Sequence, residues 1–231
     1  MCGIVAYLGQ KQAFPVIVNG LKRLEYRGYD SSGISVLHNG EVLNHKKKGK
    51  VTEMESTCPE EFKDVSVGIG HTRWATHGIP SDRNAHPHLS EDGAMSIVHN
   101  GIIENFDTIK TQLIKRGYTF HSDTDTEVLA YLISDVLKNE KVSLFQAVRL
   151  ALTQVVGAYA IVVMHKDFPG LLVAARKGSP LVIGIGDDEY YLASDATPIV
   201  EFTKDVVYLE EEEIAEVSLE TGLNIKTLKN E

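Results

Sequence analysis

The order of strand-like and helical stretches limits the folds open to this chain. Short apolar runs bounded by Gly, Asp or Asn come first, amphipathic helical stretches occupy the middle, and strand-like runs return from residue 158 onward. Parallel sheets need strands that alternate with helices, and that alternation is missing. The sequence therefore predicts an α+β fold with antiparallel sheets and helices outside them. Because no repeat or linker-like tract interrupts it, residues 1–231 are predicted to form one domain.

Turn and capping signals locate the individual elements. Asn39-Gly40 between two apolar runs predicts a hairpin, and Asn105 and Gly117 are predicted to cap and end a helix. Two capping boxes mark further helix starts: Thr124 with Glu127, and Ser143 with Gln146. The predicted helices cover 13–24, 106–116, 125–136 and 144–155. The predicted strands cover 4–8, 33–37, 42–46, 65–72, 94–99, 158–164, 171–175, 181–185, 190–193, 206–209, 214–218 and 224–228.

Charge and cysteine content exclude several function classes. The formal net charge of −9 disfavours nucleic-acid and anionic-membrane partners, since both kinds of binding depend on Lys and Arg. Cys2 and Cys58 are too few for a disulfide framework. No signal-peptide pattern or apolar stretch of transmembrane length is present. We therefore expect a cytoplasmic protein that binds neither nucleic acid nor membrane.

Cys2 stands directly behind the initiator methionine, at the start of an apolar run. Removal of Met1 would give Cys2 a free α-amino group beside its thiol. That amine has an unperturbed pKa of roughly 7.7–8.0, so one residue would supply both a nucleophile and a base. The alternative is an ordinary small residue at a strand start, and position alone favours it.

Other polar residues fall where predicted strands end, the usual place for site residues. Asn100 offers a side-chain amide and Gly101 an unhindered backbone N–H, which together have the composition of an oxyanion hole. The alternative is another Asn-Gly turn. Arg73 has the fork geometry that holds a carboxylate, although it equally fits a surface ion pair. Asp125, in the first turn of a predicted helix, suits a substrate ammonium, or simply the helix dipole.

A metal site has weaker support. Five of the nine histidines lie between His71 and His99, but no Cys-x-x-Cys or His-Glu-x-x-His spacing accompanies them. Hydrogen-bonded loop histidines are the better interpretation, and metal binding is a distant alternative. We expect no cofactor.

An ordered set of motifs runs through nearly the whole chain. The motifs are Cys2-Gly3-Ile4-Val5, Leu24-Glu25-Tyr26-Arg27-Gly28-Tyr29-Asp30-Ser31, His71-Thr72-Arg73-Trp74-Ala75-Thr76-His77-Gly78, Asn84-Ala85-His86-Pro87-His88, His99-Asn100-Gly101-Ile102-Ile103-Glu104-Asn105, Ser122-Asp123-Thr124-Asp125-Thr126-Glu127, Gly178-Ser179-Pro180-Leu181 and Ala193-Ser194-Asp195. Each motif alone is weak, but the ordered set resembles the glutaminase domain of glucosamine-6-phosphate synthase (glutamine:fructose-6-phosphate amidotransferase, isomerizing). This is a class II, N-terminal-nucleophile amidotransferase.

The resemblance implies a fold and a reaction. The fold would be a four-layer αββα sandwich of two antiparallel sheets. The enzyme would hydrolyse L-glutamine to glutamate and ammonia through a Cys2 thioester, the glutaminase half-reaction of a transaminase that converts fructose 6-phosphate to glucosamine 6-phosphate. C-terminal sugar-isomerase domains would complete the enzyme, which would be a homodimer.

The resemblance also assigns roles to individual residues. Cys2 would be the nucleophile, with Asn100 and Gly101 as the oxyanion hole. The remaining assignments are Arg73 and Asp125 for the glutamine carboxylate and ammonium, Thr76 and His77 for the rest of the pocket, Trp74 as a gate for ammonia, and Arg27 as a support for Cys2. Two alternatives stay open: another class II amidotransferase, such as one of purine or asparagine synthesis, and a non-catalytic glutamine-sensing module.

Overall fold

The computed structural model describes residues 2–229, which form two sheets and five α-helices. The strands of the first sheet are β1 (Gly3–Leu8), β2 (Ser31–His38), β3 (Glu41–Lys48), β4 (Val67–Arg73), β9 (Val182–Gly186), β10 (Glu189–Ala193) and β11 (Val206–Tyr208). Those of the second are β5 (His88–Leu89), β6 (Met95–Ile103), β7 (Gly157–His165), β8 (Leu171–Lys177), β12 (Glu213–Ser218) and β13 (Gly222–Thr227). The helices are α1 (Ala13–Leu24), α2 (Val51–Ser56), α3 (Phe106–Lys115), α4 (Asp125–Glu140) and α5 (Leu144–Leu152), with short 3₁₀ turns at Glu25–Arg27 and Glu60–Phe62.

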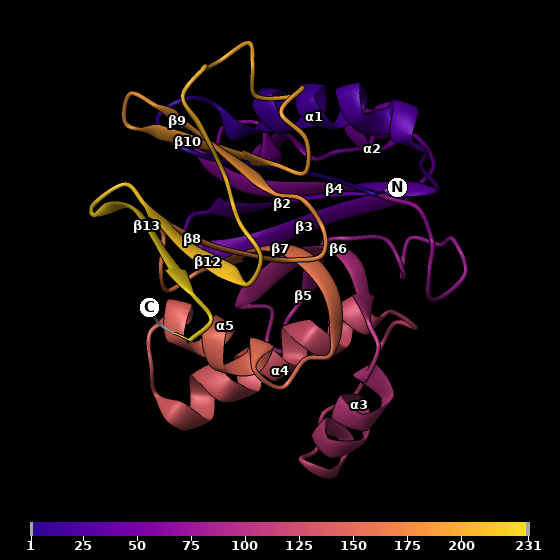
Figure 1. Cartoon of the computed structure of the whole chain (residues 1–231). Coiled ribbons are helices and arrows are strands. Elements are labelled where there is room, and N and C mark those ends of the chain that lie inside the picture. The colour runs from indigo at the N-terminus through magenta and orange to yellow at the C-terminus, as the bar shows by residue number, and fades with distance from the viewer. Residues whose placement is uncertain (1, 230–231) are drawn as a thin grey trace.

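The two sheets lie face to face between two layers of helices (Figure 1). The seven-stranded sheet has the order β11-β9-β10-β1-β4-β2-β3, and the six-stranded sheet has the order β13-β12-β8-β7-β6-β5. The paired strands in both sheets run antiparallel. Helices α1 and α2 cover the outer face of the first sheet, and α4 and α5 cover that of the second (Figure 1). The predicted αββα sandwich is confirmed.

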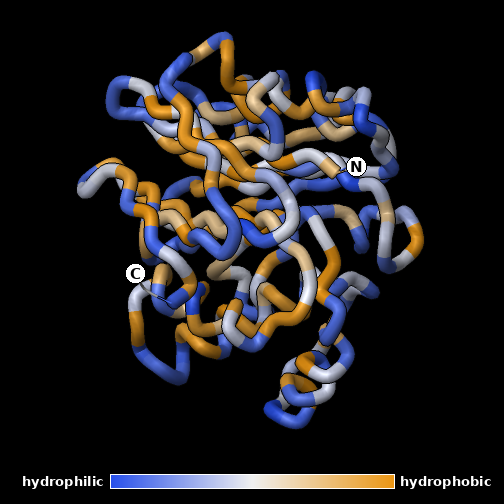
Figure 2. The backbone as a smooth tube through the Cα atoms, in the orientation of Figure 1, coloured by the Kyte–Doolittle hydropathy of each residue, from blue (hydrophilic) through white to orange (hydrophobic). Residues whose placement is uncertain are grey.

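Three apolar cores correspond to the three contacts between these layers. One joins α1 and α2 to the seven-stranded sheet, and includes Ile17 and Leu21. A second fills the space between the sheets, with Ile4 and Val162 among its members. The third packs α3, α4 and α5 against the six-stranded sheet. The tube in Figure 2 is accordingly hydrophobic along many inner strand and helix segments, and hydrophilic at many loops. Burial on both faces explains why several strands read as continuous apolar runs rather than as alternating ones.

Most predicted elements are found where the sequence places them. Helix α1 has the predicted bounds, and all seven predicted strands after residue 157 are present. Asn39 and Gly40 both adopt positive φ, at 50° and 79°, as a tight hairpin between β2 and β3 requires. Helix α5 ends at Leu152, earlier than predicted, and the sequence analysis did not predict α2 or the two-residue β5.

Two local predictions are wrong. Strand β6 does not end before Asn100 and Gly101, because both residues pair with β7 and the strand continues to Ile103. Asn105 occupies the N-cap position of α3 without capping it. Its side chain is instead hydrogen-bonded to the loop before β7, accepting from the Val156 N–H at 2.9 Å.

The sheet pairing explains how distant segments reach one place. Strand β1 lies between β10 and β4, and Gly3 pairs with Thr72. The start of β1 therefore lies beside the end of β4, where Arg73 and the following loop begin.

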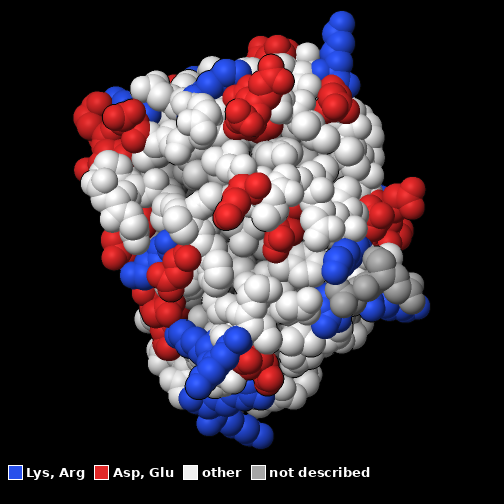
Figure 3. Space-filling model, turned by 90° about the vertical axis from the view of Figure 1, so that its left-hand side faces the viewer, with Lys and Arg blue, Asp and Glu red and all other residues white. Residues whose placement is uncertain are grey.

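Among residues 2–229 no helix is long and apolar enough to cross a membrane. On the face shown in Figure 3, acidic and basic side chains gather toward the edges, and further acidic side chains lie in the middle among uncharged residues.

Candidate active site

Cys2 lies in the wall shared by two pockets. Its Sγ accepts a hydrogen bond from the Trp74 N–H at 3.2 Å and lies 3.5 Å from the Trp74 carbonyl oxygen. Burial raises the pKa of the Cys2 thiol, while the Trp74 N–H acts in the opposite direction. The thiol therefore needs a base to become a nucleophile at neutral pH.

The first pocket, which we call the polar pocket, has an empty volume of about 260 Å³. It is lined by Cys2, Arg73, Trp74, Thr76, His77, His86, His99, Gly101, Thr124, Asp125 and Thr126. These residues come from β4, β6, the N-terminal end of α4, two loops and the position just before β1, so both sheets contribute to the pocket.

Arg73 brings a positive charge to this pocket although its side chain is only 3% exposed. Its Nη2 donates to the carbonyl oxygens of His77 and Gly78, the latter at 2.9 Å, which holds the loop against the guanidinium. Nη1 is buried, lies 3.6 Å from Asp30 Oδ1, and has no hydrogen-bond partner among residues 2–229. A buried guanidinium N–H without a partner is well suited to a ligand carboxylate.

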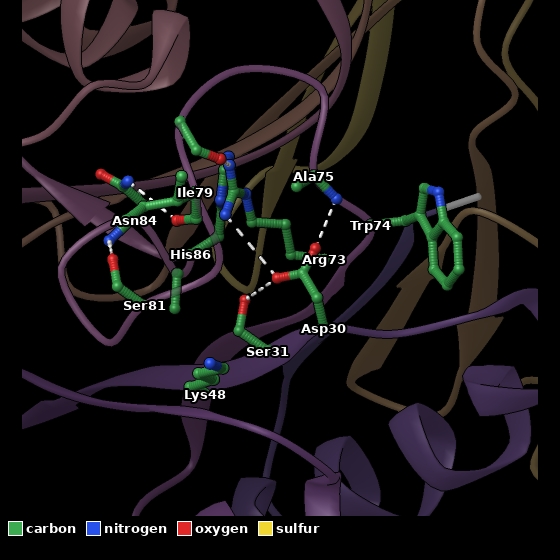
Figure 4. A network of polar contacts seen from close by, with 12 residues as sticks. Asp30, Ser31, Lys48, Arg73, Trp74, Ala75, Ile79, Ser81, Asn84 and His86 are labelled. Carbon is green, nitrogen blue, oxygen red and sulfur yellow. Dashed lines mark hydrogen bonds and ion pairs between the residues drawn. The ribbon is translucent and has the colours of Figure 1, made fainter.

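Asp30 organises the segment that carries Arg73. Its carboxylate accepts from the Ser31 hydroxyl at 2.8 Å and from the Ala75 N–H, and also faces Arg73. Figure 4 shows Asp30 between these partners, whereas the Trp74 ring points away from the network. Asp30 thus fixes the turn after β4. The side chains of Arg73 and Trp74 point in different directions from this turn.

Asp125 brings a negative charge to the same pocket from the first turn of α4. Its Oδ2 accepts from the Ile103 N–H at 2.8 Å, which ties the helix to the end of β6. The Thr124 hydroxyl caps α4 by accepting from the Glu127 N–H, as the capping box predicts. The Glu127 carboxylate does not close the box, because it accepts instead from the backbone N–H of Ser122 and of its neighbour at 121.

Asn100 and Gly101 lie beside Cys2 within strand β6. Asn100 Nδ2 donates to the Cys2 carbonyl oxygen at 3.2 Å, and its Oδ1 faces His71 Nε2 at 2.9 Å. Gly101 has a φ of +132°, and a Cβ there would lie 2.1 Å from the Ala158 carbonyl oxygen. Only glycine fits this position, because β7 approaches too closely for any side chain.

The second pocket, which we call the apolar pocket, also includes Cys2 in its wall and has an empty volume of about 910 Å³. It is lined by Cys2, Arg27, Trp74, Thr76, Asn100, Gly101, Ile102, Ser179 and Pro180. Trp74 is 54% exposed here and Ile102 is 40% exposed. Arg27 Nη1 donates to the Ser194 hydroxyl at 3.4 Å, and that hydroxyl accepts from the Ile4 N–H. Arg27 is therefore linked to the strand that begins behind Cys2.

Comparison with known proteins identifies the family. A profile of the glutamine amidotransferase domain family matches residues 56–225, most of the chain. This chain belongs to that family.

Curated relatives of this amidotransferase domain are longer proteins. This chain is 52% identical over 231 residues to the glutamine–fructose-6-phosphate aminotransferase (isomerizing) of Bacteroides thetaiotaomicron, and the match covers all of this chain and 38% of the relative. It is 49% identical over 218 residues to the protein of the same name from Pyrococcus horikoshii, covering 94% of this chain and 36% of the relative. The chain therefore spans a little over a third of the length of these relatives.

Solved structures agree with the family assignment. The glutamine phosphoribosylpyrophosphate amidotransferase of B. subtilis, complexed with ADP and GMP, superposes with a TM-score of 0.84 at 27% identity. The match covers 98% of this amidotransferase domain and 49% of that chain. A glutamine aminotransferase class-II domain protein of Silicibacter pomeroyi has a TM-score of 0.63 at 14% identity, a likeness of fold alone.

The structure brings all nine sequence-predicted site residues to one place. Each lines the polar pocket or the apolar pocket: Cys2, Arg27, Arg73, Trp74, Thr76, His77, Asn100, Gly101 and Asp125. His77 Nε2 is buried without a hydrogen-bond partner among the described residues. These positions agree with the roles that the resemblance implies, although the roles themselves remain predictions.

Sequence reasoning missed the residues that support the site. Asp30 and His71 both stand inside quoted motifs, and their place there was the available signal. A polar residue at a strand end, like Asp30, carries no sign of its partner 43 residues later, since the contact depends on the pairing of β2 with β4.

Four buried histidines form a cluster at the polar pocket, and two of them, His86 and His99, line it. His71 stacks on His86 with ring centroids 4.4 Å apart, and His86 meets the edge of His88 at 4.7 Å. The Thr126 hydroxyl lies 2.7 Å from His86 Nε2 and 2.9 Å from His99 Nδ1. Burial lowers the pKa of all four rings, that of His71 to about 3. They are neutral hydrogen-bonding groups, and no group of three or more residues suited to hold a metal occurs within residues 2–229.

Proposed function

We propose that this domain is a glutaminase that hydrolyses L-glutamine to glutamate and ammonia through a thioester on Cys2. The observation that carries the proposal is the position of Cys2 in the wall of a pocket that holds both Arg73 and Asp125. A buried cation and a buried anion in one small pocket match the two charged ends of an α-amino acid. The side-chain amide of such a ligand would then extend toward Cys2.

The reaction follows from these positions. After removal of Met1, the α-amine of Cys2 takes the thiol proton, and the thiolate attacks the amide carbon of glutamine. The oxygen of that amide becomes negative and is stabilised by the N–H groups of Asn100 and Gly101. The amine then gives its proton to the departing nitrogen, which leaves as ammonia. Water attacks the resulting γ-glutamyl thioester with the amine as base, and glutamate and the free thiol are released.

The other residues have supporting roles in this proposal. Thr76 and His77 complete the polar pocket around the substrate. Arg27 supports the strand that carries Cys2 through its bond to Ser194. Trp74, exposed at the mouth of the apolar pocket, controls the passage of ammonia away from Cys2.

For the whole protein, the acceptor is proposed to be fructose 6-phosphate and the product glucosamine 6-phosphate. The support is the printed name of the relatives that are 52% and 49% identical to this chain. Residues 1–231 would be one domain, followed by sugar-isomerase domains in a cytoplasmic homodimer. Assay of the full-length gene product with fructose 6-phosphate and with other acceptors distinguishes this enzyme from amidotransferases of purine or asparagine synthesis.

The glutaminase proposal is tested by comparing two forms of the chain, one with Met1 removed and one with it retained, each verified by intact mass. We expect glutamate release and a trapped γ-glutamyl adduct on Cys2 only in the first form, because the base is the free α-amine. Turnover by the Met1-retaining form would refute the role of the amine. Glutamine binding without turnover by the processed form would identify a sensing module instead.

A further inference from the structure

The side-chain amide of Asn100 has two different ends, and both reach from β6 toward residues in or directly next to the seven-stranded sheet. Its Oδ1 faces His71 Nε2 on β4 at 2.9 Å, and its Nδ2 donates to the Cys2 carbonyl oxygen at 3.2 Å. β4 belongs to the seven-stranded sheet and β6 to the six-stranded one, so the His71–Asn100 contact crosses the central interface between the sheets. The orientation of this amide decides whether N–H groups or an oxygen face Cys2.

The proton on His71 can be assigned from a neighbour that is unable to donate. His71 Nε2 lies 3.0 Å from the backbone carbonyl oxygen of His99, which only accepts hydrogen bonds. Nε2 must therefore carry the hydrogen. An Nε2–H requires an acceptor from Asn100, so the amide oxygen faces His71 and the NH₂ group faces Cys2.

The His71 ring itself has little freedom to move. It is fully buried, and it stacks on His86 at a ring-centroid distance of 4.4 Å. Its Nδ1 is buried without a hydrogen-bond partner among residues 2–229, as expected for the unprotonated nitrogen of a neutral ring. Burial lowers the pKa of His71 to about 3, which keeps the ring neutral throughout the neutral range, while the His99 carbonyl oxygen selects the tautomer with hydrogen on Nε2.

We propose that His71 is a positioning residue of the glutaminase reaction, which holds the Asn100 amide with its N–H donors directed at the oxyanion formed beside Cys2. The inference rests on the proposed function. An amide with no partner on its oxygen would rotate, and for part of the time it would present an acceptor to the developing negative charge. The donor would then have to be reoriented during the reaction instead of being fixed beforehand.

A matched pair of variants tests this role. The amide nitrogen of His71→Gln reaches the position of Nε2 and still donates to Asn100, whereas that of His71→Asn is one carbon too short. Loss of a complete oxyanion donor costs about 10²–10³ in kcat, so His71→Asn should lower kcat about 10- to 100-fold. His71→Gln should retain kcat within about threefold, and KM should change little in both, since the substrate carboxylate and ammonium are held elsewhere.

A double-mutant cycle separates positioning from general damage to the fold. In an Asn100→Ala background, His71→Asn should cost no further activity, because the group that it positions is absent. An equal loss in both backgrounds, a loss of the same size in His71→Gln, or an effect confined to KM would overturn the inference.

A spectroscopic readout keeps the inference distinct from the glutaminase proposal. The Asn100 side-chain NH₂ signal, assigned by its absence in Asn100→Ala, should exchange slowly with water in the wild type and His71→Gln and faster in His71→Asn. Equal exchange in all three proteins would refute the positioning role even if the processed chain released no glutamate. Absence of glutamate release alone would refute the proposed function.

Discussion

The two pockets that share Cys2 differ in the charge and exposure of the residues that only one of them contains. In the polar pocket Arg73 and Asp125 are each 3% exposed, and both are held by hydrogen bonds to backbone groups. The apolar pocket has exposed apolar surface instead, since Ile102, which lines only this pocket, is 40% exposed. The polar pocket therefore presents two charged groups in fixed positions, which suits the charged ends of one amino acid. The apolar pocket offers no such set of charges, which suits a neutral product leaving Cys2.

The largest effect is expected at Cys2, which lines both pockets. Cys2→Ala in a chain lacking Met1 should lower glutamate release by at least about 10⁴-fold, because no other group can form the thioester. Cys58→Ala is the matched control: Cys58 is buried in the core under α1 and α2, and its loss should leave kcat unchanged. The assay is glutamate release with intact mass on both variants. Activity that survives Cys2→Ala would refute the nucleophile assignment.

The charged groups of the polar pocket should affect binding rather than the chemical step. Asp125→Asn keeps an oxygen for the Ile103 N–H but removes the charge that faces the substrate ammonium. Loss of one partner of a buried charge pair costs about 2–5 kcal/mol, so KM for glutamine should rise by a factor between about 30 and 4,000.

Asp123→Asn is the control for that experiment, because Asp123 lies two residues earlier and forms an exposed ion pair with Arg83. Its KM should match the wild type. If Asp125→Asn left KM unchanged, the polar pocket would not be the site of the amino-acid group, and the contrast between the two pockets would lose its basis.

The sequence predicts the helices and strands of this fold better than it predicts which distant residues come together in the site. Apolar periodicity and capping signals are local, so α1 and the strands after residue 157 were predicted close to their observed bounds. Arg73 and Asp125 line one pocket although β4 and α4 belong to layers on opposite sides of the interface between the sheets. No local sequence pattern encodes this packing of distant layers. Their pairing came from the resemblance to a family.

Two errors show where local rules fail. Asn100-Gly101 has the composition of a turn, yet Gly101 continues β6 because its φ of +132° brings it against β7. A turn and an irregular strand residue both favour glycine, so the sequence alone does not separate them. His71 likewise reads as one polar residue within a strand, and only the packing of the two sheets gives it Asn100 as a partner.

The four buried histidines at the polar pocket, namely His71, His86, His88 and His99, should make the free energy of unfolding decrease in acid. Their pKa values lie below the unfolded value of about 6.5, so the unfolded chain binds protons that the folded chain does not. Their contribution is present above pH 6.5 and is lost as the pH falls. Each ring contributes up to about 1.4 kcal/mol per pH unit below that value, and four rings together approach about 5 kcal/mol per pH unit.

Urea unfolding at pH steps from 7 to 5 measures this slope. His88→Gln should reduce it by about one proton, since it removes one ring that stays neutral in the folded state. His121→Gln, at an exposed position, is the control and should leave the slope near that of the wild type. A slope unaffected by His88→Gln would mean that this ring is protonated within the folded protein.

The smallest effect is expected on the apolar side. Ile102→Ala removes exposed apolar surface from that pocket, and glutamate release should stay within about threefold of the wild type, because Ile102 does not line the polar pocket that holds Arg73 and Asp125. Its neighbour gives a matched comparison: Ile103 is buried against α3 and α4, so Ile103→Ala should cost about 2–5 kcal/mol of unfolding free energy. Glutaminase kinetics on Ile102→Ala, with urea unfolding on both variants, separate an effect on activity from an effect on stability. A drop of more than about tenfold in kcat/KM for Ile102→Ala would show that glutamine itself occupies the apolar pocket, because a residue on the product side has no means of affecting capture of the substrate.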